Sequence, residues 1–88
     1  MSEKTLHVEL VAADRAVWSG DVKMVIAKTV EGEIGLLPGH EPMLAILGSG
    51  EVRITLPTGE SIKATADDGF LSVEHDVVTI VARAAQLA

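Results

Sequence analysis

Apolar residues recur at every second position in most of this sequence, and this alternation most constrains its fold. Leu6, Val8 and Leu10 form one such row, and Val52 and Ile54 begin another. A period of two places each row on one face of an extended strand, and no segment before residue 82 shows the period of an amphipathic helix. Turn signals follow one another at intervals of about 8–12 residues, which is typical of a sandwich or a barrel. The predicted fold class is therefore all-β.

Several segments are expected to interrupt these strands as turns. Residues 48–50 (GSG), 57–60 (PTGE) and 67–69 (DDG) contain the residue types that turns favour. Before the first of them, residues 43–47 form a continuous apolar run, which predicts a strand buried on both faces. The last residues, 82–88 (ARAAQLA), are rich in helix formers and are predicted to begin a helix.

Length and charge exclude several kinds of protein. A chain of 88 residues forms one domain, spanning residues 1–88. It contains no cysteine for a disulfide or a thiolate metal site, and no apolar run reaches the ~20 residues of a membrane span. A net charge of −6 repels nucleic acid and anionic lipid, which argues against nucleic-acid binding and direct membrane insertion. A soluble, cytoplasmic domain is expected.

The apolar content exceeds what so small a chain needs for its core. Hydrophobic residues make up 48% of the sequence, and with eight glycines the share is ~57%, against ~45–50% in typical domains. Aromatic residues are only one Trp and one Phe, so the surplus is aliphatic. Such a domain either packs very efficiently or has some of these residues covered by a partner protein, and we favour the partner.

The stretch EGEIGLLPGHEP, residues 31–42, is the strongest candidate for a functional segment. Its glycines do not form a phosphate loop, because no lysine followed by Ser or Thr comes after the last of them. No serine lies in a nucleophile-elbow pattern, which GSG at residues 48–50 resembles only superficially. The sequence therefore predicts no catalytic residue, no cofactor and no metal.

Two alternatives stay open on the residues alone. The first is a small metal- or carboxylate-dependent enzyme built around Glu31, Glu33, His40 and Glu41. Glu31 and Glu33 are two positions apart, so on an extended chain both point the same way. Such a pair usually forms a solvated acidic face, and the alternative is that it attracts a basic partner loop. The second is a β-sandwich module that binds a small ligand, for which so few aromatic residues offer little stacking surface. His7 lies opposite the first apolar row and is expected to be solvated.

The same stretch also resembles a known signature. EGEIGLLPGHEPML is similar to the central motif of the epsilon subunit of the bacterial F-type ATP synthase. LHVELVAADRAVWSGDVKMV and DDGFLSVEHDVVTIVA resemble the segments on either side of that motif, so the likeness covers nearly the whole chain. The resemblance implies the N-terminal domain of this family, a flattened β-sandwich of about ten short strands.

The resemblance also implies a function and a set of contacts. It implies a non-catalytic rotor subunit of the central stalk, which docks on the gamma subunit and the c-ring and couples proton transport to ATP synthesis. Such a subunit belongs to a hetero-oligomeric complex that is peripheral to the cell membrane on its cytoplasmic side. Carried over by position, Glu31, Gly32 and Glu33 would contact the c-ring, and His40 and Pro42 would lie at the gamma and c-ring end of the sandwich.

Two departures from the family pattern are visible. The family's second domain, a C-terminal helical hairpin, is expected to be absent after Ala88, so its ATP sensing and its inhibition of ATP hydrolysis are not expected of these residues. Asp68 stands where the family often has the first glycine of a Gly-Gly-Phe motif, so the backbone there is expected to differ.

Overall fold

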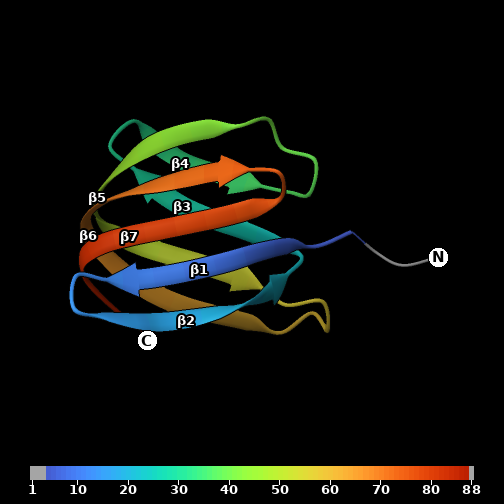
Figure 1. Cartoon of the computed structure of the whole chain (residues 1–88), viewed down its shortest axis with the longest axis horizontal. Helices are drawn as coiled ribbons and strands as arrows, with labels where there is room; N and C mark the ends of the chain where they lie inside the picture. Colours follow the sequence, from blue (N-terminus) through green and yellow to red (C-terminus); the bar gives the residue numbers. More distant parts are fainter. Residues whose placement is uncertain (1–3, 88) are drawn as a thin grey trace.

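The computed structural model of this chain describes residues 4–87, which form seven β-strands and no helix. The strands are β1 (Leu6–Ala12), β2 (Arg15–Val22), β3 (Met24–Thr29), β4 (Gly32–Leu36), β5 (Met43–Thr55), β6 (Ser61–Glu74) and β7 (Val77–Leu87). They form one sheet in the order β2-β1-β7-β6-β5-β3-β4 (Figure 1). Only the pairing of β1 with β7 is parallel among these strands. The all-β prediction is confirmed, and no helix within residues 4–87 is long and apolar enough to cross a membrane.

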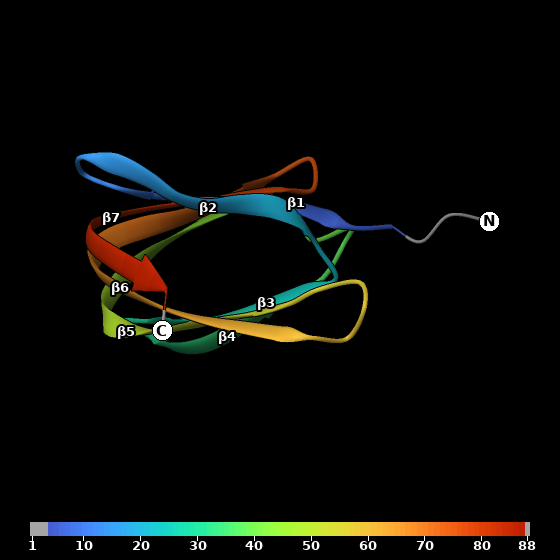
Figure 2. The same cartoon turned by 90° about the horizontal axis from the view of Figure 1, so that it is seen from below.

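The sheet folds over on itself because its three long strands bend, which gives two layers (Figure 2). The pairing of β5 with β6 is interrupted between Leu47↔Gly69 and Ser49↔Asp67. The pairing of β6 with β7 is interrupted at the same place on β6. The first halves of β5 and β7 and the second half of β6 therefore join β1 and β2 in one layer, here called the upper layer. The remaining halves join β3 and β4 in the lower layer.

This bend corrects two expectations. The expected count of about ten strands is wrong, because β5, β6 and β7 each run through both layers and count once instead of twice. Residues 48–50 and 67–69 are not turns, since they lie inside β5 and β6. The glycines and aspartates of these segments instead lie where β5 and β6 bend from one layer into the other. Asp68 has a positive φ of 54°, a left-handed conformation that Asp tolerates better than most residues.

Gly69 lies where β6 and β7 come closest at the bend. A Cβ atom built on Gly69 would lie 1.9 Å from the carbonyl oxygen of Val81 and 2.6 Å from Cα of Ala82. Both are backbone atoms of a paired strand, so they cannot move aside independently. The fold requires glycine at this position.

The end of the chain is a strand and not the beginning of a helix. Residues 84–87 continue β7 and pair with residues 64–67 of β6. Ala82 and Ala85 are buried on the inner side of the sheet. The helix prediction for residues 82–88 is thus wrong over 82–87, and Ala88 lies outside the described residues. Pairing with an existing strand outweighs the intrinsic preference of a few alanines for helix.

The core lies between the two layers and consists of the alternating rows. Leu6, Val8 and Leu10 are fully buried, and so is Ile54 in the facing layer. Each such side chain contributes about 1.5–3 kcal/mol of burial free energy. For these rows the alternation read from the sequence identifies the inner face correctly, whereas on β3 the buried residues are Val25 and Ala27 and not Met24 and Ile26.

Candidate functional site

Val30 and Glu31 form a tight, internally braced turn between β3 and β4. The hydroxyl of Thr29 donates to the carbonyl oxygen of Gly32 (2.7 Å) and accepts from the backbone N–H of Glu31 (3.2 Å). Gly32 has a φ of 127°, which a residue with a side chain rarely adopts. Glu31 is exposed and belongs to no ion pair within residues 4–87. The turn thus has an ordered backbone, from which the carboxylate of Glu31 extends into solvent.

Glu33 lies on β4 and has different surroundings. Its carboxylate is 3.9 Å from the guanidinium of Arg53, which also lies 3.3 Å from Glu51. These side chains are about half exposed, so the pairs add about 0–1 kcal/mol of stability. Glu31 and Glu33 do not share one extended strand, because Glu31 belongs to the turn and β4 begins at Gly32.

Residues 37–42 form a second fixed loop that contains His40 and Pro42. The backbone N–H of His40 donates to the carbonyl oxygen of Leu37 (3.2 Å), and Gly39 between them has a φ of 87°. The N–H of Gly39 donates to the carboxylate of Asp76 (2.7 Å), in the turn between β6 and β7. The Nδ1 of His40 lies 2.7 Å from the carbonyl oxygen of Glu41. This loop is therefore pinned both internally and to a neighbouring turn.

The two candidate segments lie at opposite ends of β4 (Figure 1). Glu31 precedes the strand and His40 follows it, so Glu31 and Glu33 do not converge with His40 and Glu41 on one site. Within residues 4–87 no group of three or more His, Cys, Asp or Glu side chains is arranged to hold a metal ion. The site required by the metal- or carboxylate-enzyme alternative is not assembled.

A cleft elsewhere on the molecule also lies away from the predicted site residues. It has a volume of about 700 Å³ and is lined by residues 12–15, Thr65, Asp67 and residues 83–86. None of Glu31, Gly32, Glu33, His40 and Pro42 contributes to it. The stretch that the sequence singles out therefore lies outside this cleft.

An exposed apolar surface borders the turn and was not located from the sequence. We call it the outer apolar patch: Val30, Leu44, Ile46 and Phe70, whose exposed fractions are 64, 67, 56 and 40%. The prediction that residues 43–47 are buried on both faces is wrong, because no other layer covers the outer side of β5. The strand itself is confirmed.

The members of the outer apolar patch are contiguous. Ile46 and Phe70 are directly paired across β5 and β6. The backbone N–H of Val30 donates to the carbonyl oxygen of Ile46 (3.0 Å). A Cβ built on Gly48, on the same side of β5 as Ile46, would lie 3.5 Å from the side chain of Val30. Since Glu31 follows Val30 in the turn, apolar and acidic groups meet at one margin, as in a protein-docking surface.

Comparison with known proteins agrees with this geometry. Residues 5–88 match the family described as the β-sandwich domain of the delta/epsilon chain of ATP synthase. The chain is 52% identical over 82 residues to the ATP synthase epsilon chain of Micrococcus luteus, covering 93% of this chain and 90% of that relative. It is 52% identical over 89 residues to the ATP synthase epsilon chain of Rhodococcus jostii, of which it covers 71%.

The fold also matches a solved structure. A chain of the Euglena gracilis mitochondrial ATP synthase, described as the OSCP/F1/c-ring in a rotational state, superimposes with a TM-score of 0.90 at 25% identity. The match covers 97% of this chain and 54% of the Euglena chain, so this chain spans about half the length of that one.

Proposed function

Since this chain belongs to the delta/epsilon family of ATP synthase chains through its β-sandwich domain, we propose that it is a non-catalytic component of the central stalk. In this role it docks on the gamma subunit and on the c-ring of a hetero-oligomeric complex. It couples proton transport to ATP synthesis mechanically, and it requires no cofactor of its own. The complex places it at the cytoplasmic side of the cell membrane, as a peripheral subunit.

The observation that carries this proposal is the outer apolar patch beside the acidic turn. Four large apolar side chains on β5, on β6 and in the adjoining turn are 40% or more exposed, and such contiguous exposure is unfavourable unless a partner covers it. We assign the patch to the gamma subunit, because a contact that stays fixed during rotation favours an apolar centre that excludes water.

The acidic turn is assigned to the c-ring, with Glu31, Gly32 and Glu33 as the contacting residues. The bracing by Thr29 supports this assignment, since a turn that is already ordered loses little entropy on docking. The free carboxylate of Glu31 would orient a basic loop, an effect that mainly concerns association rate and register. His40 and Pro42 lie beyond the other end of β4, so they cannot contact the same c-ring loop as Glu31. We therefore assign them to the gamma subunit.

Binding to the purified cognate gamma subunit tests the proposal. The chain should be retained on immobilised gamma subunit at low and moderate salt, because an apolar contact is only weakly screened. It should show no ATP hydrolysis by itself. Absence of retention at both salt concentrations would remove the basis of the docking assignment.

Charge reversal tests the c-ring contact separately. The double variant Glu31→Lys, Glu33→Lys should fold normally, because both side chains are exposed. Its attachment to reconstituted c-ring should weaken roughly tenfold or more at low salt, as opposed charges become like charges. The double variant Asp14→Lys, Glu60→Lys makes the same change in net charge at exposed positions elsewhere and serves as the control. Equal attachment of the two variants would contradict the assignment.

A further inference from the structure

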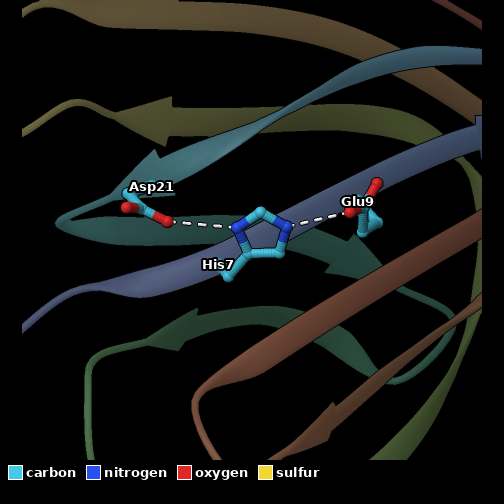
Figure 3. A network of polar contacts seen from close by, with 3 residues as sticks. All are labelled: His7, Glu9 and Asp21. Carbon is cyan, nitrogen blue, oxygen red and sulfur yellow. Dashed lines mark hydrogen bonds and ion pairs between the residues drawn. The ribbon is translucent and has the colours of Figure 1, made fainter.

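His7 is held between two carboxylates on the outward side of β1 (Figure 3). Its Nε2 lies 2.8 Å from a carboxylate oxygen of Glu9, on the same strand. Its Nδ1 lies 3.0 Å from a carboxylate oxygen of Asp21, directly opposite on β2. A neutral imidazole has one N–H and can donate to only one of them, whereas an imidazolium donates to both. The geometry is therefore complete only for the protonated ring.

The same contacts favour the protonated form energetically. The pKa of His7 is raised above its ordinary value of 6.5, chiefly by the hydrogen bond to Glu9 and next by that to Asp21. Desolvation acts in the opposite direction, and the negative charges of the two carboxylates add to the increase. His7 thus keeps its proton to a higher pH when the strands are paired than when they are apart.

The other neighbouring elements bring no competing partner within reach among residues 4–87. From β7, the residue paired with His7 is the apolar Val77. In the turn between β6 and β7, His75 lies 3.6 Å from Glu74. The carboxylate of Asp76 accepts from Gly39, and only its carbonyl oxygen reaches His7, by accepting the backbone N–H at 2.8 Å. The state of the ring is governed by Glu9 and Asp21.

Asp21 lies near the end of an edge strand. Among the described strands β2 pairs only with β1, and Asp21 is one residue from the end of β2. We propose that His7, Glu9 and Asp21 form a proton-dependent latch that holds this end of β2 against β1 and loosens when the imidazole loses its proton. The buried Val22 and the hydrogen bond from the N–H of Lys23 to Thr55 keep the strand in place in both states. The latch is independent of the docking role. Because β2 is one edge of the upper layer, the latch makes that edge sensitive to proton concentration.

The direction of the effect follows from the charges. With the ring protonated, one positive group bridges two negative ones and the cluster carries a single net negative charge. Deprotonation removes one hydrogen bond and leaves two unbridged carboxylates. Because the pKa of His7 is raised by folding, its stabilising contribution is complete below the ordinary value of 6.5 and is lost as pH rises through the raised pKa.

Amide hydrogen exchange on the chain alone, followed by NMR between about pH 6 and pH 9, tests the latch. Protection factors for residues 19–22, corrected for intrinsic exchange, should fall roughly two- to fivefold as His7 titrates. Protection in the middle of β6 should not change over the same interval. Constant protection of residues 19–22 across the titration of His7 would overturn the latch.

Three variants identify the group responsible. His7→Gln should remove the pH dependence at residues 19–22, while His75→Asn, in an exposed turn, should retain it. Asp21→Asn is a second test that does not depend on the first variant folding, because this side chain is 68% exposed. It should lower the pKa of His7 and abolish the pH-dependent loss of protection. A pH dependence that persists in His7→Gln, or a titration of His7 that Asp21→Asn leaves unchanged, would refute the latch.

Discussion

Replacing Gly69 with alanine is expected to prevent stable folding of this chain. The added Cβ would lie 1.9 Å from the carbonyl oxygen of Val81, far inside any permitted contact. Relief requires β7 to move away from β6, which would break pairs on both sides of the bend. Typical domains have a total stability of about 5–15 kcal/mol, and a small one lies at the lower end of that range. A local clash of backbone with a new side chain can therefore exceed the whole margin.

Circular dichroism and thermal unfolding measure this effect, with Gly35→Ala as the matched control. Gly35 is also a strand glycine, but a Cβ there would meet nothing within 4 Å, and its φ is not positive. We expect the control to unfold cooperatively within a few degrees of the wild type, as exposed substitutions usually do. If Gly69→Ala also retained the wild-type midpoint, the close approach of β6 and β7 at the bend would be wrong.

The same bend shows where sequence reasoning reaches its limit. The rows of Leu6, Val8 and Ile54 predict strands and their inner faces, because alternation is a local property that burial preserves. Glycine and aspartate at residues 67–69 are compatible with both a turn and a bend. Which of them forms depends on whether strand pairing resumes beyond the segment. This is decided by the pairing with Ala82 and Ala84 of β7, more than ten residues further along the chain. Local signals cannot distinguish the two.

The candidate site shows a similar division. The acidic turn and the loop around His40 were found because glycine, proline and acidic residues mark exposed backbone. The outer apolar patch was missed because an unbroken apolar run does not reveal whether a second layer covers its outer side. The expectation that His7 faces away from the core is confirmed. Its contact with Asp21 depends on the register of β1 against β2, which the sequence does not specify.

Placing a charge in the outer apolar patch should strongly weaken binding to the gamma subunit without unfolding the chain. In Ile46→Asp the new carboxylate would stay in water while the chain is free, because the native side chain is 56% exposed. Docking would then bury an unpaired charge in the centre of the contact, where substitutions have their largest effects. We expect the Kd for the gamma subunit to rise at least ~100-fold, equivalent to about 2.7 kcal/mol.

Leu87→Asp separates this effect from a general response to added charge. Leu87 is 45% exposed, lies at the end of β7 in the lower layer and is not part of the patch, so its variant should bind like the wild type. Both variants add one negative charge to a chain that already carries −6, so long-range repulsion changes equally in the two. A large loss in Ile46→Asp alone therefore reports the local burial of the patch. An equal loss in both variants would point to net charge, and unchanged binding in both would mean that the gamma subunit docks on another surface.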